Sequence, residues 1–166
     1  MALSKADLIA SLQNEVRILL HLTTKIDKSM LEYRPTPKQR STIELLRYLS
    51  IMGPGLVPAI KTGTFDGAAW GTATAAAAAK DFDAIVADLA KQSDFYASAV
   101  GEMPEASFAE PLEMFGRTNT RGYHLVNLVV SGHAAYRTQL FCYLKACGKD
   151  DLNTSNLWGG VDAPMS

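Results

Sequence analysis

Apolar residues recur at steps of three and four along four stretches of the chain, the spacing that places them on one face of an α-helix. The first stretch predicts a helix over residues 4–31, which starts at the capping pair Ser4 and Asp7. Its apolar face consists of Leu8, Leu12, Val16, Leu19, Ile26 and Met30. The two prolines of residues 33–37 cannot continue a helix, so this segment is predicted to be a rigid connector.

The second stretch begins at a capping box, in which Glu44 can reach back to the amide of Ser41. The glycines and prolines of residues 53–58 predict a break or strong kink in the helix that follows. Residues 62–71 are rich in glycine and lack periodicity, which predicts a loop folded back onto the end of the bundle. The aromatic residues expected from this loop at the mouth of a central pocket are Phe65 and Trp70.

A third helix is predicted over residues 75–100, because the alanine run 75–79 strongly favours helix and leads directly into a periodic apolar stretch. Gly101 is expected to end it, and prolines keep the next stretch irregular. The fourth helix is predicted over residues 120–146, with Gly148 as its stop. Apolar residues surround much of this helix, which predicts packing on several sides and, over part of its surface, a homodimer interface.

Four apolar-striped helices without a convincing alternating strand predict an all-α fold, a four-helix bundle. At 166 residues the chain is long enough for one full core and too short for two ordinary domains. We therefore expect one domain over residues 1–150 and a C-terminal tail over residues 151–166. Leu157 and Trp158 of the tail are expected to dock on the bundle.

Charge and composition limit the classes of partner. The 16 Lys and Arg residues balance 17 Asp and Glu residues, and no basic run is interleaved with aromatics, so nucleic acid is not an expected partner. No stretch approaches about 18 uncharged apolar residues, and the N-terminal segment lacks the apolar region of a secretory signal. We therefore expect a cytoplasmic protein with no membrane partner. Cys142 and Cys147 are expected to be free thiols of core type.

The order of several short motifs resembles that of the DinB-like superfamily over residues 8–148. The motifs are a Tyr-Arg-Pro connector at residues 33–35, a Ser-x-x-Glu-Leu-Leu helix start at residues 41–46 and an Arg-x-Gln-Leu sequence at residues 137–140. The resemblance implies a DinB-like four-helix bundle with a central pocket. It also implies a divalent metal bound by three histidines, one on the second helix and two on the fourth.

This sequence departs from the superfamily at all three expected ligands. The motifs align Tyr48 with the histidine of the second helix, and Gly132 and Tyr136 with the pair on the fourth. Glycine has no side chain that can bind a metal. His133 is the remaining candidate nearby, but it lies about 100° around the helix from position 132, and nothing in the sequence demands the π-bulge that would correct its direction. The expected metal site is therefore degenerate.

Two hypotheses of different classes follow, and the sequence leaves open whether the chain is an enzyme. In the first, it has no cofactor and is a small-molecule binding protein or dimeric interaction protein, with a pocket lined by Tyr48, His133 and Tyr136. In the second, it is a hydrolase or thiol-transfer enzyme that holds Ni, Zn or Fe at a displaced site on His133, or a metal-free acid–base catalyst that uses His133 and Tyr136. Glu15 is the carboxylate candidate of this second hypothesis.

Each candidate also has an ordinary structural role. The tyrosines and the histidine of the predicted pocket are equally suited to a helical core in which their polar atoms find partners. Arg137 is expected to form an ion pair with Glu15 or Glu44, unless it holds an anionic ligand. The other two histidines, His21 and His124, are expected at surface or helix-end positions.

Overall fold

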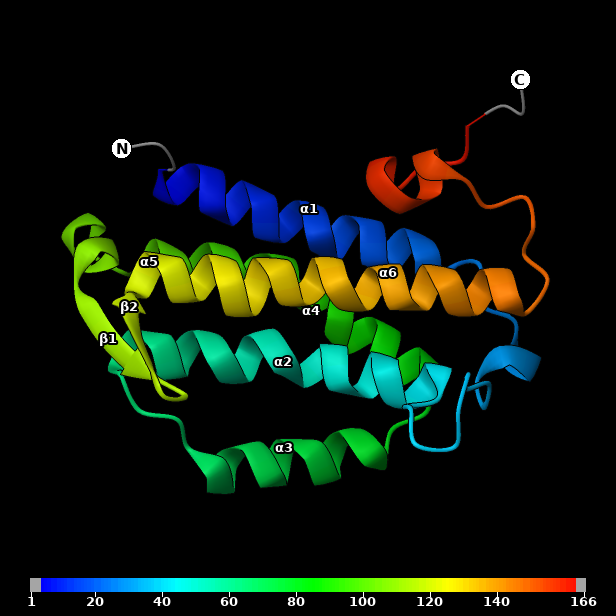
Figure 1. Ribbon diagram of the computed structural model, residues 1–166, viewed down its shortest axis with the longest axis horizontal. Coiled ribbons are helices and arrows are strands. Elements are labelled where there is room, and N and C mark those ends of the chain that lie inside the picture. Colours follow the sequence, from blue (N-terminus) through cyan, green and yellow to red (C-terminus); the bar gives the residue numbers. More distant parts are fainter. Residues whose placement is uncertain (1–3, 164–166) are drawn as a thin grey trace.

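Four long helices pack side by side in the computed structural model, which describes residues 4–163 (Figure 1). They are α1 (Lys5–Thr23), α2 (Thr42–Thr62), α4 (Phe82–Gly101) and a fourth that consists of α5 (Arg121–His124), a π-helical segment (Leu125–Val130) and α6 (Ser131–Ala146). Both α1 and α2 contact α4 and the fourth helix, so the four helices enclose one core. The predicted all-α four-helix bundle is confirmed. Residues 1–3 and 164–166, the outer ends of the predicted domain and tail, lie outside the described residues.

The core lies between these helices, and α2 contributes the largest part of it. Its fully buried residues include Leu45, Leu46, Leu49, Val57 and Ile60, and each such side chain stabilises the fold by about 1.5–3 kcal/mol. By length and composition, α2 is also the one helix within residues 4–163 that is long and apolar enough to cross a membrane. In this structure, 61% of its 18-residue apolar window is buried inside the bundle.

The first helix starts at the predicted capping box but ends at Thr23 rather than at residue 31. The hydroxyl groups of Thr23 and Thr24 each donate a hydrogen bond to the carbonyl three residues earlier. Such bonds compete with the regular helical pattern and favour the end of a helix. A separate 3₁₀ turn, Lys28–Met30, then leads toward α2. The prediction was therefore wrong at this end of the helix.

The second helix runs without a break through its two internal prolines, where a break or strong kink was predicted. Because Pro54 has no N–H group, the carbonyl of Ser50 loses its helical donor. The side-chain amide of Gln92 on α4 donates to that carbonyl at 3.0 Å and replaces the missing bond. A Cβ atom on Gly53 would lie 1.6 Å from the hydroxyl oxygen of Tyr96, so the glycine allows α4 to approach closely. The Gly-Pro-Gly sequence is thus a packing site within α2.

The predicted loop and third helix have wrong bounds. The loop ends at Asp66, which caps an additional helix, α3 (Gly67–Ala78), and Asp81 caps α4 in the same way. Each aspartate accepts a hydrogen bond from the backbone N–H three residues later. The alanine run therefore belongs to the end of α3 and does not continue into α4. α3 packs on the outside of α2 (Figure 1).

A short β-hairpin occupies part of a stretch that was predicted to be irregular, after a 3₁₀ turn over Glu105–Ala109. Its strands, β1 (Pro111–Met114) and β2 (Arg117–Thr120), pair antiparallel. The two turn residues between them both have positive φ, as a tight hairpin requires. The hairpin lies at the end of the bundle where α2 ends and α5 begins (Figure 1). Thr120 then caps the fourth helix at its predicted start.

The fourth helix spans the predicted range, although its π-helical segment had no signal in the sequence. Most of its large apolar residues face the interior of the bundle, and the exposed strip of α6 consists of Ser131, Ala135, Thr138, Cys142 and Ala146. Cys142 and Cys147 are free thiols, as predicted. The exposed Cys142 is not a core residue, so that part of the prediction was wrong.

The C-terminal segment returns along the bundle and reaches α1 (Figure 1). A π-helical turn, Ser155–Gly159, packs on α1 and α6, and Asn156 within it is buried. Leu157 is half-buried, as the predicted docking requires. Trp158 is 67% exposed, and its ring lies over the guanidinium group of Arg137 at the surface of the bundle.

Candidate functional site

The three positions assigned to metal ligands line one cavity between α2 and α6. Tyr48 comes from α2, whereas Gly132 and Tyr136 lie four residues apart on one face of α6. The cavity has a volume of about 510 Å³. The rings of Tyr48 and Tyr136 meet edge to face, with their centroids 4.9 Å apart. The alignment of the motifs therefore identified three residues that share a cavity in the folded chain.

The residues of this cavity do not fit a three-histidine metal centre. Gly132 supplies no donor atom, and a Cβ atom at that position would lie 2.9 Å from the sulfur of Met52. Burial, followed by the effect of neighbouring Tyr136, raises the pKa of Tyr48 to about 12, so this phenol keeps its proton at neutral pH. Within residues 4–163, no three His, Cys, Asp or Glu side chains lie close enough together to hold a metal ion. The cavity instead offers neutral hydroxyl groups and apolar walls.

The outer wall of the cavity is aromatic. Trp70 projects from α3 onto α2 at Gly55, where a Cβ atom would lie 2.8 Å from the indole ring. The indole centroid lies 6.2 Å from that of Tyr48 and 5.5 Å from that of Phe65. Phe65 in turn packs on Phe115 of the hairpin turn, at 5.4 Å. Phe65 and Trp70 thus line the cavity, as predicted from their position in the chain.

His133 faces away from this cavity, toward α4. It is 1% exposed, and its Nε2 lies 2.6 Å from the hydroxyl oxygen of Tyr96. Burial, followed by the nearby Arg137 guanidinium, lowers the pKa of His133 to about 4, so the imidazole is neutral at pH 7. Its Nδ1 has no hydrogen-bond partner in the part of the chain that is described. As helix geometry predicted, His133 points in a different direction from position 132. The structure does not bring it together with Tyr48 and Tyr136.

Arg137 and Glu15 form a buried ion pair between α6 and α1. Two parallel contacts join them, from Nε to Oε2 at 2.5 Å and from Nη2 to Oε1 at 3.3 Å. The remaining guanidinium nitrogen donates to the carbonyl of Leu157, and the ring of Trp158 lies 5.4 Å from the guanidinium carbon. One of the two predicted partners of Arg137 is therefore correct, whereas Glu44 is engaged at the start of α2. Neither member of the pair lines the tyrosine cavity.

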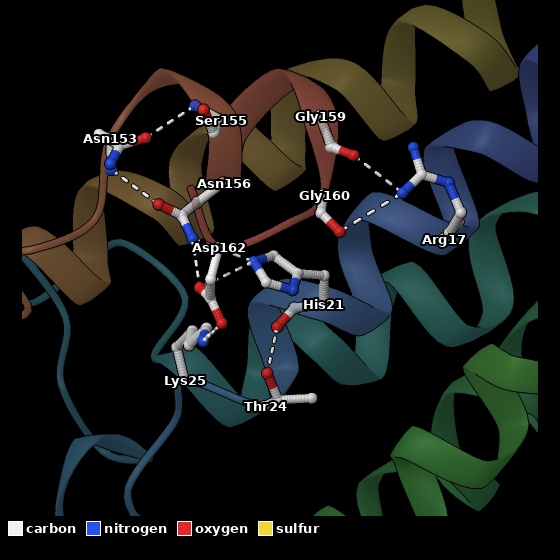
Figure 2. Close-up of polar contacts among 10 residues, drawn as sticks. All are labelled: Arg17, His21, Thr24, Lys25, Asn153, Ser155, Asn156, Gly159, Gly160 and Asp162. Carbon is white, nitrogen blue, oxygen red and sulfur yellow. Dashed lines mark hydrogen bonds and ion pairs between the residues drawn. The ribbon is translucent and has the colours of Figure 1, made fainter. Parts of the chain in front are cut away.

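Further polar contacts attach the C-terminal segment to α1, as Figure 2 shows. Arg17 donates to two backbone carbonyls of the segment. The side-chain nitrogen of Asn156 lies 3.0 Å from Nε2 of His21 and 2.8 Å from a carboxylate oxygen of Asp162. Lys25 also pairs with Asp162, at 2.6 Å. His21 lies in the last turn of α1, as predicted, and the tail covers it.

Sequence reasoning missed two features close to the site. His124 lies at a helix end, one of the two expected positions, but it is 3% exposed and its Nε2 lies 3.0 Å from the carbonyl oxygen of Leu112 in β1. The hairpin that covers it was not predicted. Met52 lies four residues after Tyr48, on the same face of α2, and occupies space next to Gly132. That spacing was visible in the sequence and identifies Met52 as a neighbour of the site.

Comparison with known proteins agrees with the motifs at the level of the fold. No protein-family model matches the chain, and no curated protein matches it. Among solved structures, the crystal structure of a DinB-like protein from Bacillus subtilis, YjoA, is similar, with a TM-score of 0.67 and 18% sequence identity. The similarity covers 89% of this chain and 95% of that chain. The chain therefore has a DinB-like fold.

Proposed function

We propose that the protein binds a small molecule in the cavity of Tyr48, Met52, Gly132 and Tyr136. The observation that supports this function most is that the aligned ligand positions carry two phenols and a glycine, and that all three line one cavity. Its volume, about 510 Å³, lies within the range of about 300–1,000 Å³ that is usual for ligand sites. Mainly apolar walls with a few polar groups are also typical of such sites.

The lining of the cavity indicates the chemistry of its ligand. The phenols of Tyr48 and Tyr136 can donate and accept hydrogen bonds, and the aromatic wall that includes Trp70 favours a flat apolar ring. Asn127 and Ser131 supply further polar groups at the exposed rim. We therefore expect a small aromatic molecule that carries a hydroxyl or carbonyl group.

The contacts of the predicted catalytic residues support binding over catalysis. The imidazole of His133 is engaged by Tyr96, and the carboxylate of Glu15 is engaged by Arg137. Tyr136 lies in the cavity, on a different side of α6 from His133. A hydrolase, a thiol-transfer enzyme or an acid–base catalyst built on these groups would have to break these contacts first.

Binding can be tested with phenol as a probe, by nuclear magnetic resonance of the Trp70 indole N–H in a Trp158→Phe background. Ala135 lies on the exposed wall of the cavity, and Ala135→Leu should fill part of it without disturbing the core. We expect this change to weaken phenol binding by about tenfold or more, the effect of losing about 1.4 kcal/mol of binding free energy. Thr138→Leu, on the same exposed strip but outside the cavity, should leave binding unchanged. Equal affinities in the two variants would contradict the proposed site.

The assignment of the ligand positions has its own test. The combined changes Tyr48→His, Gly132→His and Tyr136→His, with Met52→Ala to give room to the new imidazole at position 132, should create binding of a divalent metal such as zinc or nickel. Titration calorimetry in competition with a chelator measures the metal affinity that these changes create. His133→Ala should leave the metal content of the natural chain, purified without an affinity tag, unchanged. If the natural chain contains near-equimolar metal and His133→Ala loses it, the result would instead support the metal-dependent enzyme.

A further inference from the structure

A second cavity, of about 450 Å³, lies beside the tyrosine cavity near the start of α2. Four cationic side chains line it, together with a single carboxylate, that of Glu44. These cations are Arg34, Lys38, Arg40 and Arg47. The whole chain carries a formal net charge of −1, so its composition does not predict a local cluster of positive charge such as this one.

Two of the four cations are already engaged. Arg34 pairs with Glu44 at 3.2 Å, and Arg47 donates to the carbonyl of Lys80 at 2.7 Å. Lys38 and Arg40 pair with no carboxylate within residues 4–163. Their charges are therefore available to an anion.

Arg40 connects the cationic cluster to the tyrosine cavity. Its guanidinium carbon lies 4.2 Å from the centre of the Tyr48 ring, a cation–π contact that holds the charge at the boundary. Tyr48 and Trp70 line both cavities. The two spaces therefore adjoin along the same two aromatic side chains.

We propose that the ligand is an aromatic molecule that carries an oxyanion, a phosphate or carboxylate group. Its ring occupies the cavity of Tyr48 and Tyr136, and its oxyanion binds Lys38 and Arg40. This inference rests on the proposed function, to which it adds the charge of the ligand. Charge-assisted hydrogen bonds from a guanidinium fork and an ammonium group suit both oxyanions.

Four probes separate the parts of the inference: phenol, phenyl phosphate, benzoate and inorganic phosphate. Each is titrated into the Trp158→Phe protein, in which the indole N–H signal comes from Trp70 alone. We expect phenyl phosphate to bind about tenfold or more tightly than phenol, the effect of one or two charge-assisted contacts. The advantage should decrease as the salt concentration rises, because these cations are exposed. Comparison of benzoate with phenyl phosphate shows which oxyanion the cluster prefers.

A double variant locates the oxyanion. Lys38→Gln with Arg40→Gln should abolish the advantage of phenyl phosphate over phenol. Lys28→Gln with Arg117→Gln is the matched control, since it removes the same charges at two exposed positions outside both cavities. The control should retain the full advantage of phenyl phosphate. Thermal unfolding followed by circular dichroism checks that both variants are folded.

Three outcomes would overturn the inference. Equal affinities for phenol and phenyl phosphate would remove the oxyanion site and leave the proposed function intact. Inorganic phosphate that binds as tightly as phenyl phosphate would show that the cations act without the aromatic cavity. Failure of both phenol and phenyl phosphate to perturb Trp70 would overturn the proposed function as well.

Discussion

The buried imidazole of His133 makes the stability of the bundle depend on pH. Its pKa is about 4 in the folded chain, against 6.5 for an exposed histidine. Between these values the unfolded chain binds a proton that the folded chain does not. The full stability is therefore present above roughly pH 6.5 and is lost at about 1.4 kcal/mol per pH unit as the pH falls toward 4. Urea unfolding at pH 7 and pH 5 should differ by about 2 kcal/mol from this residue alone.

Two variants isolate that effect. In His133→Phe, the free energies of unfolding at pH 7 and pH 5 should become nearly equal. The new ring next to Tyr96 also changes the stability, but by the same amount at both pH values. Burial also lowers the pKa of His21, so His21→Asn measures the contribution of that residue to the pH dependence of stability. An undiminished pH dependence in His133→Phe would show that the imidazole is not neutral in the folded chain.

Gly53 is the residue where the smallest change should have a large effect. Gly53→Ala places a methyl group 1.6 Å from the hydroxyl oxygen of Tyr96, inside the core, and should destabilise the fold by about 2–4 kcal/mol. Gly71→Ala is the matched control, because nothing lies within 4 Å of the added atom in α3. It should stabilise by up to about 1 kcal/mol through helix propensity. Urea midpoints measure both, and similar midpoints would contradict the close approach of α2 and α4.

At the scale of single residues, motif order identified Tyr48, Gly132 and Tyr136 because their spacing on two helices fixes which face each occupies. It also showed that His133 points elsewhere, since one residue turns a helix by about 100°. The partner of His133 was not predictable. Tyr96 is distant in the sequence, and only the arrangement of α4 and α6 around the core decides that the two side chains meet.

At the scale of elements, Asn156 holds the C-terminal segment on α1 (Figure 2). Asn156→Ala removes its hydrogen bonds with His21 and Asp162, which should cost about 1–3 kcal/mol. Hydrogen exchange should become faster in the segment and in the last turn of α1. Thr154→Ala, at an exposed position of the same segment, is the control and should change neither rate. Equal protection in both variants would show that the segment is held by other contacts.

The elements differ in how far the sequence specifies them. The capping boxes at Ser4 and Ser41 fixed two helix starts, because a cap is a local hydrogen bond. Asp66 and Asp81 gave similar local signals, which the alanine run between them obscured. The continuity of α2 had no local signal at all. A residue of α4, Gln92, supplies the bond that Pro54 cannot make.

At the scale of the whole molecule, the homodimer stays a prediction. The large apolar side chains that suggested it are mostly covered within one chain, and the exposed strip of α6 has mainly small residues. If two copies pair through these strips, Cys142 of each should form a disulfide-linked dimer under mild oxidation. Cys142→Ser, which retains Cys147, should abolish the link. A monomer mass by light scattering at all concentrations would contradict the dimer.

The sequence by itself determined the fold class and the positions of most helices. These properties depend on periodicity, caps and residue identity, which act over a few neighbouring positions. Only the tertiary structure decided that Tyr48 and Tyr136 share an open cavity, that His133 is buried against Tyr96, and that free cations adjoin the site. Those properties depend on contacts between helices far apart in the chain, which no local pattern records.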